Sequence, residues 1–188
     1  MRKFFKKNIK IGILGGTFDP PHKGHLHISK IALTKLRLNK ILWIVAKRNP
    51  LKQKPYLKIK TRVKLAQKIT NKNKKIFVQH FSNKIISNNT FNSLNYLKKK
   101  HKNAKLFFLI GADNLIKFHK WNNWKEIPKL AKIVVFPRGN HLVKKNKYTV
   151  TKSFKKKDLI YINSKKVNIH GYKKQYTNTS LEFIYRLV

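Results

Sequence analysis

Residues 11–30 read IGILGGTFDPPHKGHLHISK, an apolar run followed by a polar loop and then by a helical pattern. The apolar run ends in Gly15 and Gly16, which lack side chains, so their backbone N–H groups can approach an oxyanion closely. Pro20 and Pro21 stiffen the loop before a helix can begin. The helix start supplies free N–H groups and a partial positive charge, which suit phosphate. We therefore expect a strand, a phosphate-binding loop and a helix, in this order.

Two histidines follow the prolines of this loop. His22 and His25 are three residues apart around Gly24, so on a helix or a tight turn they share one face. Two imidazoles placed in this way can straddle a phosphate chain, and Gly24 leaves room for a flat ligand such as a base. Exposed side chains and half of a zinc site are the alternatives, although helical zinc pairs usually lie four residues apart near a third ligand. The whole loop favours phosphate binding.

Outward from this loop, apolar strands and helical patterns alternate every 25 to 35 residues. Repeated β-α-β units predict an α/β fold, a Rossmann-like, doubly wound parallel sheet with helices on both faces. We expect a single domain over residues 1–188. The expected strands cover residues 10–16, 40–46, 75–81, 105–111, 132–139 and 158–169; the expected helices cover 24–36, 58–69 and 90–101, with short ones at 114–121 and 124–131; residues 141–157 look basic and irregular.

Ligands of such a sheet bind beyond the carboxyl ends of the strands, where the strand order reverses. Three unusual loops each follow a predicted strand: GGTFDPPHKGH at 15–25, AKRNPLKQK at 46–54 and GADN at 111–114. Because the carboxyl ends of parallel strands lie at the same edge of a sheet, these loops are expected to form one site.

The composition is strongly basic, with 46 Lys and Arg residues against five Asp and Glu, a net charge of +41. Such a charge attracts polyanions. The lysines occur in almost every segment, as a drift towards A- and T-rich codons would produce, so we expect no specific nucleic-acid partner; a basic nucleic-acid-binding protein is the alternative. The absence of cysteine excludes disulfides and thiolate metal sites. Without a signal-peptide core or a membrane-length apolar run, we expect a cytoplasmic protein with no membrane partner.

The segment GGTFDPPHKGH resembles the signature of the nucleotidyltransferase superfamily that carries a His-x-Gly-His motif. It is most similar to bacterial nicotinate-nucleotide adenylyltransferases, whose pattern Gly-Gly-x-Phe-Asp-Pro-x-His-x-Gly-His is matched at every defined position from Gly15 to His25. His22 favours this branch, because pantetheine-phosphate adenylyltransferases resemble it but carry Thr at that position. The resemblance is strong over residues 8–139 and weak over 140–188.

Further segments resemble the same family in the same order along the chain. They are LWIVAKRNPLK with Pro50 and Lys52, the helix that contains Arg62, NNTFNSL with Thr90, LFFLIGADNLIKFHKWNNWKEI with Asp113 and Trp121, and FPRG with Arg138.

One family motif is not found. The late Ile-Ser-Ser-Thr-x-Ile-Arg segment, which places hydroxyls and an Arg against the triphosphate, is expected after Asn168, where the chain reads NIHGYKKQYTNTSLEFIYRLV. Lys173 or Lys174 could substitute as a point charge without the planar fork of Arg. An inactive remnant with an intact fold is therefore an alternative.

The resemblance implies transfer of the adenylyl group of ATP to nicotinate mononucleotide, giving deamido-NAD and pyrophosphate, by in-line attack without a covalent intermediate. Nicotinamide mononucleotide and pantetheine phosphate are alternative acceptors. It implies Mg²⁺ bound mainly through the ATP phosphates, with no protein metal site, and leaves the oligomeric state open. The implied residues are His22, His25 and Lys52 for catalysis; Gly15, Gly16, Thr17, Phe18, Gly24 and Asp113 for ATP; and Asp19, Thr90, Trp121 and Arg138 for the mononucleotide.

Three of these residues have simpler interpretations that stay open at this point. Lys52 could be one more surface lysine. Asp113 opens the next helix in sequence, so it could be an N-cap as well as an acceptor for ribose hydroxyls. Trp121 could stack on the pyridine ring, or it could form a core-facing helical pair with Trp124.

Overall fold

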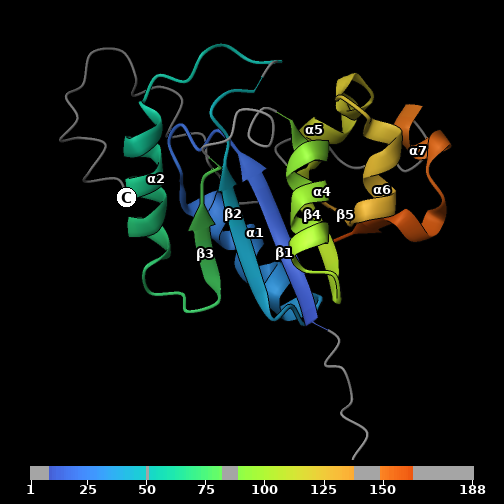
Figure 1. Cartoon of the computed structure of the whole chain (residues 1–188), viewed down its shortest axis with the longest axis horizontal. Coiled ribbons are helices and arrows are strands. Elements are labelled where there is room, and N and C mark those ends of the chain that lie inside the picture. Colours follow the sequence, from blue (N-terminus) through green and yellow to red (C-terminus); the bar gives the residue numbers. More distant parts are fainter. Residues whose placement is uncertain (1–8, 50, 82–88, 138–148, 163–188) are drawn as a thin grey trace, which may run out of the picture.

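The computed structural model describes residues 9–49, 51–81, 89–137 and 149–162. These residues form a six-stranded sheet in the order β3-β2-β1-β4-β5-β6, in which every neighbouring pair is parallel (Figure 1). The chain moves outward in one direction from β1 to β3 and then returns to start again at β4. The strand order therefore reverses between β1 and β4, and the predicted Rossmann-like, doubly wound α/β fold is confirmed.

The elements follow the predicted alternation. The strands are β1 Ile9–Gly16, β2 Lys40–Val45, β3 Ile76–Gln79, β4 Ala104–Gly111, β5 Lys132–Phe136 and β6 Leu159–Tyr161; the α-helices are α1 Lys23–Lys35, α2 Ile59–Thr70, α4 Thr90–Lys100, α5 Ala112–Ile116, α6 Ile127–Leu130 and α7 Thr149–Ser153; the 3₁₀ turns are η1 Phe118–Lys120, η2 Trp124–Glu126 and η3 Lys156–Asp158.

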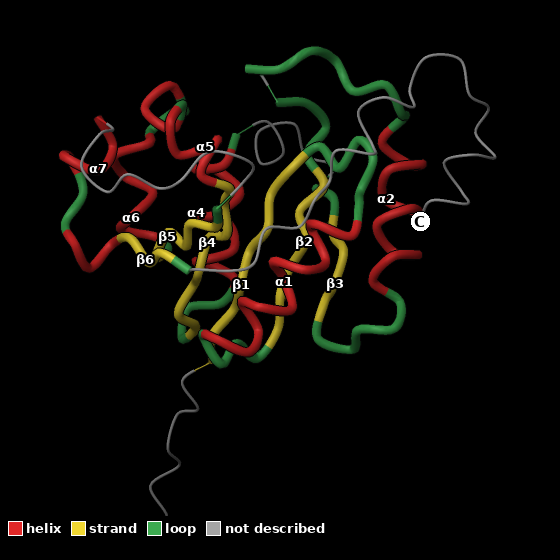
Figure 2. Tube along the Cα trace, turned by 180° about the vertical axis from the view of Figure 1, so that it is seen from behind, coloured by secondary structure: helices red, strands yellow, loops and turns green. Residues whose placement is uncertain are grey.

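Helices cover both faces of the sheet, as Figures 1 and 2 show from opposite sides. The α1 and α2 side chains pack on one face, around Trp43 and Val45 of β2. The helices α4 to α7 pack on the other face, around Phe108 and Ile110 of β4. Because both faces are covered, the central strands are near-continuous apolar runs, which is why the sequence shows them clearly. No helix among the described residues is long and apolar enough to cross a membrane.

After residue 140, the structure differs more from what the sequence predicts. The segment expected to be irregular contains α7 and η3. Tertiary packing explains α7: Val150 is fully buried, and the ring of Phe154 contacts those of Phe118 and Trp124 at centroid distances of 5.9 and 5.4 Å. A short lysine-rich helix gives little local signal when distant aromatic rings stabilise it.

Two further expectations depend on residues outside the described ranges. The last expected strand, 158–169, is described as the three-residue β6, and residues beyond 162 lie outside the described part. The single domain over residues 1–188 stays a prediction for the same reason.

Gly12 of β1 provides a test of how tightly the α1 face is packed. A Cβ atom on Gly12 would lie 2.8 Å from Leu38 Cδ1 and 2.9 Å from Ile41 Cγ1, well inside normal carbon–carbon contact. Gly12→Ala is expected to lower the free energy of unfolding by about 1–3 kcal/mol. Gly15→Ala is the control, because its Cβ would meet Phe108 at 3.6 Å, an ordinary contact. Denaturant unfolding of both variants measures the difference; equal stabilities would contradict this packing.

Candidate active site

The loops that follow β1, β2 and β4 lie at the carboxyl edge of the parallel sheet. Gly15 and Gly16 end β1, and Gly111 ends β4, which is the neighbour of β1 across the point where the strand order reverses. In doubly wound sheets this is the place where a crevice forms. The predicted clustering of the three loops at one edge is thus confirmed by the topology.

The end of β1 leaves room for a ligand to come close to the backbone. Gly15 is exposed, and a Cβ atom there would contact only the ring of Phe108, at 3.6 Å. A Cβ on Gly16 would meet Phe18 at 3.6 Å. The packing of the described chain therefore does not require glycine at either position. Bare backbone at a strand end is useful where a ligand must come close to the main-chain amides.

The loop after β1 is fastened to β2 by an aromatic stack. Phe18 has a φ of 49°, in the left-handed region, and its ring is 2% exposed. The ring stacks on Trp43 at a centroid distance of 4.9 Å and an angle of 15°, and lies 4.8 Å from the ring of His25. A left-handed Phe costs about 1–2 kcal/mol, which burial of the ring offsets. Because the ring is buried, a contact between Phe18 and ATP would use its main chain; that contact stays a prediction.

His22 and His25 begin helix α1 and lie against each other. His22 is the N-cap, with extended backbone, and His25 is three residues further on. His22 Nδ1 accepts the N–H of Gly24 at 3.1 Å, and His25 Nδ1 accepts the N–H of His22 at 3.2 Å. Their ring centroids are 3.8 Å apart. The structure therefore brings the two predicted imidazoles together, at the helix N-terminus that follows Gly15 and Gly16.

A hydrogen-bonded chain holds this turn of α1 on the sheet. Trp43 Nε1 donates to Ser29 Oγ at 2.9 Å, and Ser29 Oγ donates to the carbonyl of His25 at 2.8 Å. Ser29 is fully buried. The sequence analysis did not identify Trp43 and Ser29. Tryptophan in an apolar strand has no distinguishing pattern, and a serine on a helix becomes conspicuous only when its burial is known.

Arg62 of α2 joins three separate segments of backbone. Arg62 is 2% exposed, and within the described part of the chain its side chain donates to carbonyl oxygens. Nε donates to Leu57 at 3.0 Å, Nη1 to Ala46 at 2.7 Å and to Thr17, and Nη2 to Lys47 at 3.0 Å. Burial lowers the pKa of Arg62, while the charge of Asp19 acts in the opposite direction. Arg62 thus ties the loop after β1 to both ends of the loop after β2.

Asp19 adds further bonds, so that Arg62 and Asp19 together form a clamp on the loops after β1 and β2. Its two carboxylate oxygens accept the backbone N–H groups of Tyr56 and Leu57, the latter at 2.9 Å. Asp19 was expected to bind the mononucleotide, which stays a prediction; the structure gives its carboxylate a role in fixing the end of the loop after β2. Lys52, in the middle of that loop, is exposed. Both ends of the loop are therefore fixed while the lysine projects from it.

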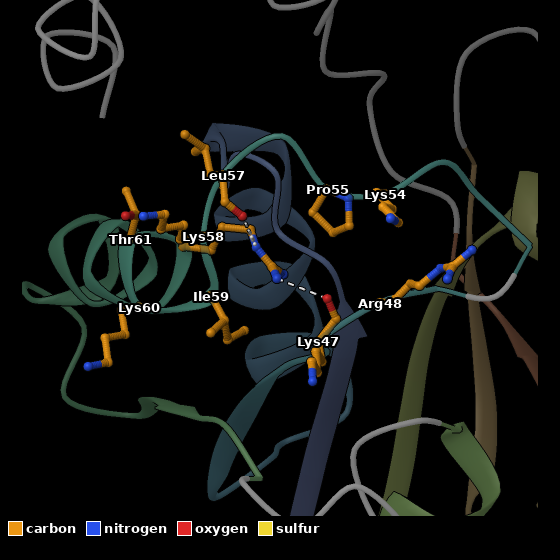
Figure 3. A pocket seen from close by; sticks show the side chains of 10 residues that line it. Lys47, Arg48, Lys54, Pro55, Leu57, Lys58, Ile59, Lys60 and Thr61 are labelled. Carbon is orange, nitrogen blue, oxygen red and sulfur yellow. Dashed lines mark hydrogen bonds between the residues drawn. The ribbon is translucent and has the colours of Figure 1, made fainter.

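A pocket of about 790 Å³ opens beside this clamp (Figure 3). Leu57 and Lys47, whose carbonyls Arg62 contacts, line it, and the labelled side chains of Figure 3 come from the loop after β2 and the first turn of α2. The lining residues are Lys47, Arg48, Lys54, Pro55, Leu57, Lys58, Ile59, Lys60, Thr61 and Arg62. The basic side chains make the pocket suitable for an anion, although His22 and His25 do not line it.

The other expected site residues lie on the β4 side or are not described. Thr90 is the first residue of α4, and Asp113 lies in the first turn of α5, directly after β4. Trp121 stacks on Phe118 at 4.8 Å and meets the ring of Phe108 at 6.0 Å. Since Phe108 also lies beside Gly15, Trp121 belongs to the same part of the sheet edge. Trp121 therefore packs on the core through Phe118 and Phe108, and it lies between η1 and η2 rather than in the helical pair with Trp124 that was considered. Ligand stacking stays a prediction.

Arg138 and the C-terminal segment that departs from the family pattern lie outside the described residues. The same holds for Pro50. The roles expected of these residues stay predictions.

Comparison with known proteins agrees with this arrangement. The sequence profile of the cytidylyltransferase-like family matches residues 13–168. A protein of Pelagibacter ubique, named a probable nicotinate-nucleotide adenylyltransferase, is 47% identical over 164 residues, which cover 87% of this chain and 91% of the relative. This chain belongs to the nicotinate-nucleotide adenylyltransferase family. Another member, from Agrobacterium fabrum, is 32% identical over 77% of both chains.

Solved structures show the same fold at lower identity. The nicotinic acid mononucleotide adenylyltransferase of Plasmodium falciparum, complexed with NaAD, superposes with a TM-score of 0.68 at 21% identity, over 84% of this chain and 77% of that one. A putative nicotinate-nucleotide adenylyltransferase from Vibrio parahaemolyticus gives a TM-score of 0.55 at 23% identity, over 68% and 76% of the two chains. The adenylyltransferase fold of this chain thus extends to distant relatives.

The clamp predicts a large loss of stability from a conservative change. Arg62→Lys keeps the charge, but one ammonium group cannot reach four carbonyls in three segments, so some of them are left unsatisfied. We expect the free energy of unfolding to fall by about 2–3 kcal/mol. Lys64→Arg, on the exposed side of the same helix, is the control and should change stability by less than about 0.5 kcal/mol. Chemical denaturation measures both; a neutral Arg62→Lys would show that the clamp contributes little.

Proposed function

We propose that this chain transfers the adenylyl group of ATP to nicotinate mononucleotide, releasing pyrophosphate and deamido-NAD. The observation that carries the proposal is the His22–His25 pair at the N-terminus of α1, directly beyond the open glycine end of β1. The 47% identical relative is named for this activity, and the Plasmodium falciparum enzyme of the same fold is recorded with NaAD and with APC. These comparisons support nucleotide substrates for this chain.

In the proposed reaction, the phosphate oxygen of the mononucleotide attacks the α-phosphorus of ATP in line. That oxygen is already anionic near neutral pH, so no general base is needed. The protein positions the two phosphates and stabilises the charge that develops on the departing pyrophosphate. His22 and His25 hold the α- and β-phosphates, and the amides of Gly15, Gly16 and Thr17 contact phosphate oxygens. Lys52 reaches a phosphate from the loop that Arg62 and Asp19 hold in place.

Mg²⁺ fits this site through the nucleotide. The groups that surround the expected triphosphate position are backbone N–H groups and imidazoles, which suit phosphate oxygens rather than a hard cation. Among the described residues, no group of three His, Asp or Glu side chains is placed to hold a metal ion. In the proposal, the triphosphate oxygens and water are the ligands of Mg²⁺, and the ion supplies neutralisation of phosphate charge.

The mononucleotide occupies the β4 side of the edge in this proposal. The ring of Trp121, half-buried and packed on Phe118, forms a rigid wall on which the pyridine ring stacks. Thr90 at the start of α4 bonds near that ring, Asp113 accepts hydroxyls of a ribose of the ATP, and Gly24 leaves space for the adenine. Arg138, outside the described residues, is assigned to the mononucleotide from the family resemblance alone. A cytoplasmic location likewise remains a prediction.

The function is tested by measuring pyrophosphate release from ATP with each candidate acceptor: nicotinate mononucleotide, nicotinamide mononucleotide and pantetheine phosphate. We expect turnover with nicotinate mononucleotide to exceed that with the other two by at least about tenfold, since a missing charged contact costs on the order of 1.4 kcal/mol or more. Absence of release with every acceptor would support the inactive remnant, for which the departure from the C-terminal family motif is the sequence argument.

Replacing His22 tests its assigned role. His22→Ala is expected to lower turnover by about 100-fold or more, the scale of losing one preorganised donor to a transition-state charge. Lys23→Ala, which removes an exposed cation at the adjacent position, should leave turnover within about twofold. Steady-state pyrophosphate release gives both values, and an unchanged rate in His22→Ala would remove this residue from the mechanism.

Trp121 is tested through the Michaelis constants. Trp121→Ala should raise the KM for the mononucleotide by about tenfold, because stacking of a base on an aromatic ring contributes about 1–3 kcal/mol. Trp121→Phe keeps a ring on Phe118 and should recover most of the affinity, while the KM for ATP stays the same in both variants. A parallel rise of both constants would indicate that Trp121 acts through core packing instead.

A further inference from the structure

Lysines and exposed aromatic rings gather at the edge of the sheet opposite the candidate active site. The strands begin at this edge, the lower one in Figure 1, and α4 ends there. The amino-edge patch, as we name it, consists of Lys40, Lys75, Phe77, Tyr96, Lys100 and His101. The loops after β1, β2 and β4 lie at the other edge, so the patch is separate from the groups assigned to the reaction.

The starts of β2 and β3 bring two lysines together. The N–H of Ile41 donates to the carbonyl of Lys75 at 2.8 Å, so Lys40 and Lys75 lie side by side at the starts of adjacent strands, about 4.8 Å apart. Phe77 pairs in register with Leu42, which belongs to the core on the α4 side. Because side chains alternate between the two faces of a strand, Phe77 and Lys40 project towards that same side.

Helix α4 brings further members of the patch to this place. Tyr96 and Lys100 are four residues apart on α4, and Lys100 Nζ lies 6.0 Å from the centre of the Tyr96 ring. The ring of Tyr96 also meets that of Phe81, two residues beyond the end of β3, at a centroid distance of 5.2 Å. The last turn of α4 is therefore joined to the edge strand that carries Phe77.

The positive charges of the patch lie close together and away from carboxylates. Burial lowers the pKa of His101, the C-cap of α4, and the charges of Lys40 and Lys100 lower it further. Lysines from β2 and α4 thus oppose the same imidazolium. The four acids in the described ranges belong to other segments: two follow β1 and β4 at the opposite edge, and two lie in η2 and η3. A polyanion would therefore meet uncompensated positive charge at this edge.

Two aromatic rings are exposed among these cations. Phe77 is 47% exposed and Tyr96 is 37% exposed. A single exposed ring is ordinary, but rings bordered by lysines are the features to which single-stranded nucleic acids bind, because phosphates follow the cations while bases stack on the rings.

We propose that the amino-edge patch binds single-stranded nucleic acid without sequence preference, as a second function beside the proposed reaction. The phosphates lie at Lys40, Lys75 and Lys100, and bases stack on Phe77 and Tyr96. Stacking and charge are indifferent to base identity, which agrees with the expectation that the chain has no specific nucleic-acid partner.

A single strand fits the patch better than a duplex or an acidic membrane does. In a duplex the base faces stack on one another, so side chains at the protein surface cannot reach them. Membrane binding depends on an apolar face that enters the bilayer. Phe77 and Tyr96 are more than half buried and are held by a sheet edge and a packed helix, so they offer ring faces but no inserting surface. A single strand supplies phosphates and free bases together.

Fluorescence anisotropy of a labelled oligouridylate of about 12 nucleotides, between about 0.05 and 0.2 M salt, tests the charges on the full chain. Lys75→Ala/Lys100→Ala removes two exposed cations of the patch. The control, Lys30→Ala/Lys64→Ala, removes two exposed cations from the helices on the other face.

The patch pair is expected to weaken binding by about tenfold or more and to reduce the slope of log affinity against log salt by about 1.4, since each phosphate contact on a single strand contributes about 0.7. The control should stay within about twofold. Equal losses in the two pairs would mean that diffuse charge alone binds the oligonucleotide, and the proposal would be overturned.

The rings are tested by Phe77→Leu/Tyr96→Leu, which keeps apolar side chains and removes stacking. We expect affinity to fall by about tenfold or more while the salt slope stays the same. A duplex of the same length and vesicles containing phosphatidylserine serve as competitors and should be at least about tenfold weaker than the unlabelled single strand.

Unchanged affinity in the leucine variant, or stronger competition by the duplex or the vesicles, would contradict the proposal. Melting temperatures show whether each variant is folded, and the exposed lysine pair decides the outcome if the leucine variant is not. Pyrophosphate release should stay within about twofold in the lysine pair, because the patch lies at the edge opposite the candidate active site. Loss of release there would show that the two edges are not independent and would contradict a separate function.

Discussion

The bonds of Arg62 to four backbone carbonyls are the constraint on which the rest of the site depends. A buried guanidinium loses its hydration, and this cost is recovered only where its donors are satisfied with good geometry. Leu57 is a near neighbour of Arg62 in sequence, but Ala46 and Thr17 are 16 and 45 residues away, so local interactions alone could not bring the three carbonyls together. The buried charge thus defines one arrangement of the loops after β1 and β2, because any displacement would leave N–H groups or carbonyls unpaired.

Three of the five acids in this basic chain make structural contacts among the described residues. Asp19 accepts two backbone N–H groups, Glu126 pairs with Lys129 at 2.7 Å, and Asp158 accepts the N–H of Lys155 at the start of η3. Surface pairs such as Glu126–Lys129 contribute little stability, whereas a carboxylate that satisfies two loop amides contributes more. Replacement of an acid by lysine would be tolerated on an open surface but not where the acid accepts backbone bonds. Asp19 therefore has a structural role that requires no direct contact with substrate.

The sequence predicted the parts of the molecule that have a local physical signal. Central strands such as β4 are buried on both faces and are therefore apolar throughout. The glycines and the histidines of the loop after β1 lie in one short segment of sequence. It could not predict partners set by tertiary distance. Two sets of hydrogen bonds illustrate this limit. Ser29 bonds to Trp43 and to the His25 carbonyl, and Arg62 bonds to the loop carbonyls, yet both residue types are ordinary in a helix. For the same reason the sequence did not predict α7, because its stability depends on the contacts of Phe154 with rings from η1 and η2.

The large net charge of the chain and the histidine-capped first turn of α1 can act on an anion over different distances. A field from a charge of +41 acts over about 10 Å or more and draws polyphosphates towards the surface, but it has little directional information. Hydrogen-bond donors held at a helix start act over about 3 Å and define the orientation of individual oxygens. Long-range attraction is supplied by lysines throughout the chain, whereas orientation depends on the local geometry of the loop after β1. The capping bonds of His22 and His25 hold the first turn of α1 in shape beyond the end of β1. The diffuse positive charge and the rigid first turn of α1 would therefore make separate contributions to the phosphate binding of the proposed function.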